Sequence, residues 1–79
     1  MSVSGLYDAT LTQVWGIMAT VVTDGYALNV RAWCDTDAPV MGQLENGAEV
    51  ELLETGDDWS KISRGELEGY CMTKYLRWE

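Results

Sequence analysis

The feature that most constrains the fold is a short run of alternating apolar and polar residues, Leu28-Asn29-Val30-Arg31. A period of two is the pattern of a strand with one buried face, so Leu28 and Val30 are expected to face the core. Turn-rich loops separate this run from later strand signals at 49–52, 59–62 and 69–72. Short strands at this spacing predict an all-β domain, specifically a small barrel of about five or six short antiparallel strands.

The N-terminal part of the chain is divided between an extension, residues 1–15, and the barrel, residues 16–79. Within 14–23 the composition is β-branched and apolar, which predicts a strand that can bend at Gly16. The weak alternation within 7–11 leaves two interpretations of the extension open. It is either an extra strand added at a sheet edge or a linker.

Thirteen acidic side chains against five basic ones give a net charge of −8. Such a surface disfavours direct binding to nucleic acid, to anionic membranes and to anionic wall polymers. A basic partner or an uncharged peptide suits it better. The chain shows neither a secretory signal nor a transmembrane span, so we expect a cytoplasmic protein if the chain is complete. An extracellular or cell-wall location is expected if it is a domain of a secreted parent.

The residue types argue against catalysis and against bound cofactors or metals. There is no histidine for general-base chemistry or for a zinc site, and the phosphate- and dinucleotide-binding glycine motifs are absent. Of the two cysteines, Cys71 is expected to face the core and Cys34 to lie exposed in a loop. Because such a pair rarely satisfies disulfide geometry, we expect two thiols.

The ordered set of short motifs resembles the bacterial SH3 (SH3b) family over residues 16–76. The resemblance implies an SH3-like barrel without catalytic activity that binds short peptides or peptidoglycan fragments. Trp33 and Cys34 stand where that family usually has small residues. The motifs are Leu28-Asn29-Val30-Arg31, Pro39, Leu44, Gly47-Ala48-Glu49-Val50, Asp58-Trp59-Ser60-Lys61-Ile62, Gly69-Tyr70-Cys71 and Tyr75-Leu76.

Aromatic side chains on the outer face are the candidate binding surface. Trp59 alternates with the inward Ser60 and Ile62, and Tyr70 relates in the same way to Cys71, so both aromatics should point outward. Outward aromatic rings on neighbouring strands suit proline, glycine or sugar contacts, although they could instead only cover the barrel end. The full set of expected ligand-binding residues is Trp33, Trp59, Tyr70, Tyr75, Asp35 and Asp37.

Arg31 and the acidic loop after it have a second, structural interpretation. We expect Arg31 to pair with Asp35 or Asp37 and so to hold the loop. Trp33 either contacts a partner or folds back on the N-terminal extension. These roles leave the ligand contacts of the loop open.

The carboxylates support an alternative function in a different class. Glu49 and Glu51 are spaced by two along an expected strand and therefore share one face. Such a face is either simply solvated or complementary to a basic protein. In the second case the chain would be a stand-alone acidic interaction module, in the manner of small phage proteins that inhibit nucleic-acid-binding enzymes.

Overall fold

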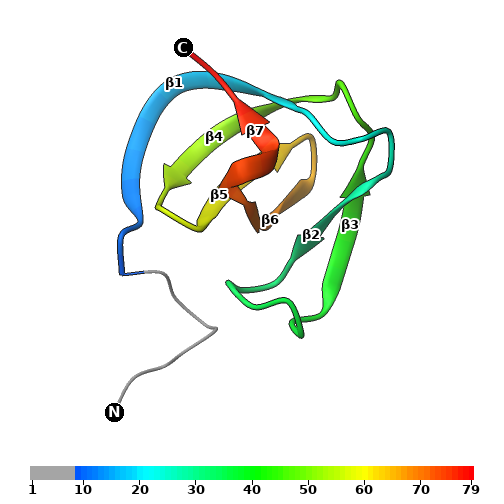
Figure 1. Ribbon diagram of the computed structural model, residues 1–79. Helices are drawn as coiled ribbons and strands as arrows, with labels where there is room; N and C mark the ends of the chain where they lie inside the picture. Colours follow the sequence, from blue (N-terminus) through cyan, green and yellow to red (C-terminus); the bar gives the residue numbers. More distant parts are fainter. Residues whose placement is uncertain (1–8) are drawn as a thin grey trace.

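The computed structural model describes residues 9–79 and shows seven antiparallel strands in one strongly bent sheet (Figure 1). Across the sheet the strand order is β3-β2-β6-β5-β4-β1-β7. This architecture confirms the all-β class and the SH3-like barrel type. The elements are β1 (Thr12–Val21), β2 (Leu28–Arg31), β3 (Val40–Leu44), β4 (Glu49–Thr55), β5 (Trp59–Arg64), β6 (Leu67–Met72), the 3-10 turn η1 (Thr73–Tyr75) and β7 (Leu76–Arg77).

The sheet is a half-barrel rather than a closed barrel. It has more strands than expected, and the last of them, β7, is 2 residues long. β1 and β4 lie on one side of the molecule and β2 and β3 on the other (Figure 1). The sheet ends at β3 and at β7, and no ladder joins these two strands within residues 9–79. No helix in this described part is long and apolar enough to span a membrane.

β1 is bent where the sequence predicts a bend. Its register against β4 shifts between Gln13 and Ile17, and Gly16 lies in this interval with a φ of 65°. Glycine adopts this left-handed conformation without the steric cost of a Cβ atom. β1 begins at Thr12, inside the segment expected as the N-terminal extension. The alternation expected from Tyr7 onward lies partly outside the described residues.

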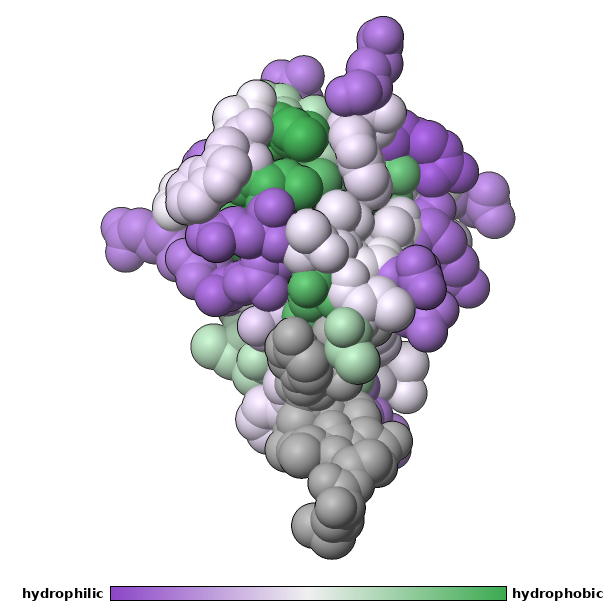
Figure 2. All heavy atoms as spheres, turned by 90° about the vertical axis from the view of Figure 1, so that its left-hand side faces the viewer, coloured by the Kyte–Doolittle hydropathy of each residue, from purple (hydrophilic) through white to green (hydrophobic). Residues whose placement is uncertain are grey.

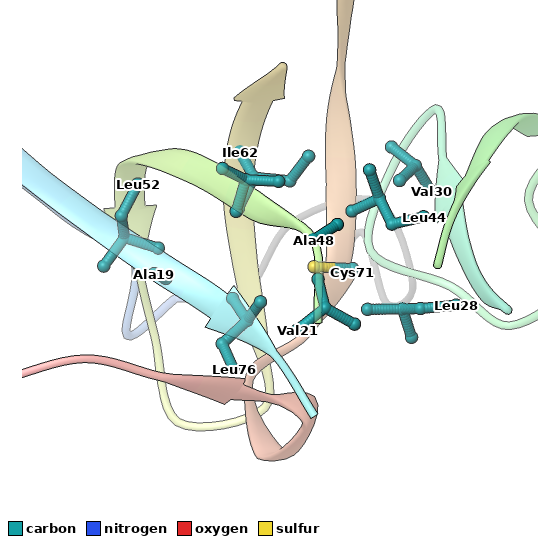
Figure 3. Packing of buried hydrophobic residues seen from close by; sticks show 11 residues of the cluster. Ala19, Val21, Leu28, Val30, Leu44, Ala48, Leu52, Ile62, Cys71 and Leu76 are labelled. Carbon is teal, nitrogen blue, oxygen red and sulfur yellow. The ribbon is translucent and has the colours of Figure 1, made fainter. Parts of the chain in front are cut away.

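The core occupies the concave side of the sheet, and alternation selects its members (Figure 3). Leu28 and Val30 of β2 are 5% and 0% exposed, as their spacing predicts. Val50 and Leu52 of β4 are each 1% exposed and approach from the opposite side of the barrel. The buried cluster comprises Ala19, Val21, Leu28, Val30, Leu44, Ala48, Val50, Leu52, Ile62, Cys71 and Leu76.

The expectation that Cys34 is exposed is wrong, because its side chain is only 4% exposed. The loop after β2 turns tightly, with the Asp35 N–H donating to the Trp33 carbonyl and the Ala38 N–H to the Asp35 carbonyl. This turn carries Cys34 inward together with Ala38, which is 3% exposed. Cys71 is buried as expected, and both cysteines are thiols.

Burial of Cys71 makes the stability of the domain sensitive to alkaline pH. The sulfur lies at the centre of the core cluster beside Ala48 and Val21 (Figure 3), and burial raises the pKa of its thiol to about 12. The folded state therefore keeps a proton that the unfolded chain loses from about pH 9 upward. We expect the free energy of unfolding to fall by about 1.4 kcal/mol per pH unit from this group alone.

Urea unfolding between pH 8 and pH 11 measures this slope. In Cys71→Ala the same scan should start from a lower stability but decline less steeply with pH. An identical slope in both proteins would contradict the assignment of the pH dependence to Cys71. Tyr70, whose pKa burial also raises, remains in both proteins and contributes equally to the two slopes.

Candidate functional site

A groove on the outer surface brings together aromatic side chains from three separate elements. Trp59 comes from the start of β5, Tyr75 from η1, and Tyr26 from the loop before β2. The groove has a volume of about 230 Å³. We call it the aromatic groove, and its lining residues are Tyr26, Ala27, Leu28, Asn29, Arg31, Thr36, Trp59, Met72 and Tyr75.

Strand alternation places two of the lining side chains on the outer face. Ser60 and Ile62 are each 0% exposed, so the neighbouring Trp59 of β5 projects to the opposite side. Met72 pairs directly with Trp59 across the β5–β6 ladder and therefore shares its face. Both side chains are half-buried. The sequence pattern thus explains why Trp59 is available at the surface without being fully exposed.

A small hydroxyl network joins the β4–β5 turn to η1 and so fixes the distance between Trp59 and Tyr75. The buried Ser60 Oγ lies 3.1 Å from Thr55 Oγ1 and 2.8 Å from Thr73 Oγ1. The Thr73 hydroxyl donates in turn to the Gly56 carbonyl at 2.9 Å. Buried hydroxyl groups are stable only when they are hydrogen-bonded, so this network holds the two segments together.

Tyr26 and Tyr75 form one side of the groove as a pair. Their ring centroids are 6.1 Å apart at an interplanar angle of 84°, an edge-to-face arrangement that aromatic rings favour. A side-chain hydrogen bond between them raises the pKa of Tyr26 and lowers the pKa of Tyr75. The Thr23 hydroxyl donates to the Tyr26 carbonyl at 2.7 Å and thereby orders the loop that carries Tyr26.

Arg31 holds the loop after β2, but not through the carboxylates that the sequence suggested. Its Nη1 donates to the Ala38 carbonyl at 2.8 Å. The Asp35 carboxylate instead accepts from the Asp37 N–H at 2.8 Å and caps a turn within the loop. The expected bracing role is therefore present, while the expected ion pair is replaced by a bond to the backbone. The half-buried guanidinium is the charged group in the lining of the aromatic groove.

Of the six residues predicted to bind ligand, the aromatic groove brings together Trp59 and Tyr75. Tyr70 lies on the same outer face, opposite Arg31 in the β2–β6 register, with Lys61 Nζ 5.9 Å from its ring centroid. Burial raises the pKa of Tyr70, although the charge of Lys61 opposes that effect. Tyr70 does not belong to the lining.

The other three predicted residues lie on the loop after β2. Trp33 is 36% exposed, and neither it nor Asp35 and Asp37 lines the aromatic groove. Thr36, between the two aspartates, does line it.

Sequence reasoning gave too little weight to several groove residues. Tyr26 and Arg31 were expected to be mainly structural, and Thr36 and Met72 were not considered. The outward position of Met72 follows from the inward position of Cys71, so alternation could have identified it. No local pattern signals Tyr26 or Thr36, because they reach the groove only through the course of their loops.

The groove is equipped for contact rather than for bond-breaking chemistry. Its polar lining groups are the amide of Asn29, the guanidinium of Arg31, the hydroxyl of Thr36 and the two phenols. Among residues 9–79, no group of three or more histidine, cysteine or acidic side chains is arranged to hold a metal ion. Aromatic faces beside hydrogen-bonding groups suit binding of an extended, weakly polar ligand.

The comparison with protein families agrees with this geometry. A family described as the bacterial SH3 domain matches residues 27–77, which run from the loop before β2 to the end of β7. The matched segment includes every lining residue of the aromatic groove except Tyr26. No curated protein matches the chain.

Proposed function

The chain belongs to the bacterial SH3 domain family, whose members are generally binding modules, and we propose that it binds a short peptide or a peptidoglycan fragment in its aromatic groove. The observation that carries this proposal is the convergence of Trp59, Tyr75 and Tyr26 from three elements. Tryptophan and tyrosine are the residue types most enriched at binding hot spots. On this proposal the domain recruits its ligand and performs no catalysis.

The size of the groove limits how much of the ligand it contacts. Pockets that enclose a whole drug-sized molecule are usually about 300–1,000 Å³, and this groove has about 230 Å³. It therefore suits a few consecutive units of a longer chain, such as two or three peptide residues. Such a ligand would lie along the rings and continue past both ends of the groove.

An NMR titration with soluble peptidoglycan fragments tests the proposal directly. The four tryptophans give four indole N–H signals, and Trp59 is the tryptophan in the groove lining. We expect fragments to shift the indole signal of Trp59 and leave that of Trp15 in place. Trp15 is 79% exposed and lies outside the lining, so it is an internal control. Shifts at Trp15 without shifts at Trp59 would contradict the proposal.

The face that carries β1 and β4 supports the second candidate function, binding of a basic protein. Glu49 and Glu51 are exposed on the same side of β4, and Met18, opposite Glu51, is 57% exposed. Hydrophilic residues flank a central band of less polar surface on both sides of this face (Figure 2). On this alternative, binding weakens steeply with salt and depends on Glu49 and Glu51. Unchanged binding after charge reversal of both residues would eliminate it.

A further inference from the structure

A second hollow adjoins the aromatic groove and shares the Tyr26–Tyr75 pair with it. Its volume is about 330 Å³. The two tyrosines line both hollows, so a ligand that passes over them reaches from one into the other. We call this second hollow the basic end of the groove, and its lining residues are Val22, Thr23, Asp24, Tyr26, Lys74, Tyr75 and Arg77.

The distribution of positive charge over the molecule singles out this region. The chain has five basic residues against thirteen acidic ones, yet Arg31 lines the aromatic groove and Lys74 and Arg77 line its basic end. The other two basic residues are ion-paired elsewhere, Lys61 with Glu68 at 3.3 Å and Arg64 with Glu45 at 3.6 Å. Among the described residues, Asp24 is the carboxylate that lines either hollow.

Lys74 and Arg77 are held where they can face a ligand. Lys74 Nζ lies 5.2 Å from the centroid of the Tyr75 ring, so the cation and the ring are presented together. Arg77 Nη1 donates to the Lys74 and Leu76 carbonyls, each at 2.8 Å, which fixes the guanidinium beside η1. A guanidinium has five N–H donors, and its second terminal nitrogen remains available to a planar acceptor such as a carboxylate.

We propose that the ligand carries a carboxylate, which Lys74 and Arg77 bind at the basic end while the adjoining segment lies in the aromatic groove. This inference rests on the proposed function and adds the chemical class of the ligand and its direction. The thirteen acidic residues of the chain strengthen the selectivity, because they repel an anionic group from most other parts of the surface. A carboxylate at one end therefore also determines which way an extended ligand lies.

Three synthetic peptides test the proposal from the ligand side. The first is acetyl-Gly-Glu-Gly-Pro-Gly with a free terminal carboxylate, the second is its C-terminal amide, and the third has glutamine in place of glutamate. Dissociation constants are measured from the Trp59 indole signal. Neutralising the bound carboxylate should weaken binding about three- to fivefold, as expected for a largely exposed charge contact. The peptide that loses affinity identifies a terminal or a side-chain carboxylate as the group bound.

Two charge-matched variants test it from the protein side. Lys74→Gln and Arg64→Gln each remove one positive charge, but only Lys74 lines the basic end. In Lys74→Gln the difference between charged and neutral peptides should disappear, whereas in Arg64→Gln it should persist. Equal loss in both variants would mean that net charge, and not a site, determines the preference.

The outcomes separate the inference from the function beneath it. Equal affinity of all three peptides, with the Trp59 signal shifting in each titration, overturns the carboxylate proposal and leaves groove binding in place. A Trp59 signal that stays unchanged with all three peptides overturns both.

Discussion

Gly69→Ala should destabilise the domain by about 3 kcal/mol, because a Cβ atom at this position would collide with the backbone of β2. That atom would lie 2.7 Å from the Arg31 carbonyl oxygen and 2.7 Å from Val30 Cγ1. Val30 is 0% exposed and cannot move without disturbing the core. Since the margin of so small a domain is only about 5 kcal/mol, thermal unfolding should shift down by about 15 °C.

Gly42→Ala is the matched control for this prediction. Its Cβ atom would meet the tip of the Leu67 side chain, with Cδ1 at 2.9 Å, and a rotation of that flexible side chain relieves the contact. The entropy that alanine removes from the unfolded chain offsets part of the remaining cost, so the net change should be within about 1 kcal/mol. Thermal unfolding that is equal for the two variants would contradict the close β2–β6 approach at Gly69.

Trp59→Ala should weaken binding of the groove ligand about 30-fold, the loss typical of a central tryptophan contact. Trp59 faces the ligand from β5, opposite the Tyr26–Tyr75 pair, and its removal takes away the largest ring of the groove. Trp15→Ala, which removes the same ring from an exposed site on β1, should change affinity less than about twofold. Isothermal titration with soluble peptidoglycan fragments measures both constants.

Two further measurements protect this result from a trivial explanation. Trp59 is half-buried, so the variant must first show a native-like NMR spectrum, and Trp59→Phe should retain part of the affinity because an aromatic face remains. Affinity of the unmodified domain should fall less than about tenfold from low to moderate salt. Binding that survives in Trp59→Ala and collapses with salt would exclude the aromatic groove and favour the acidic face of β4.

The buried positions of the strands were predictable because strand alternation is a local property. Leu28, Val30, Val50 and Leu52 face the core, as their spacing predicts, and Cys71 does the same on β6. The outward position of Trp59 follows from the same rule. Burial within loops does not follow any such period, which is why Cys34 was expected to be exposed and is instead buried.

The loop after β2 shows where local reasoning about charge ends. Arg31 was expected to brace the loop through Asp35 or Asp37, because opposite charges close in sequence attract. The backbone turn brings the Ala38 carbonyl to the guanidinium instead, and the Asp35 carboxylate is used by the Asp37 N–H. Which of several nearby acceptors is used depends on the path of the chain, and residue types alone do not specify that path.

By itself, the sequence determined the all-β class, the family, and the side of each strand that faces the core. Only the tertiary structure decided which outward side chains meet, since Tyr26, Trp59 and Tyr75 come from distant parts of the chain. It also placed Arg31, Lys74 and Arg77 along one continuous surface of a strongly acidic protein. The physical reason is that alternation is set between adjacent residues, whereas convergence depends on long-range strand pairing and on the curvature of the sheet.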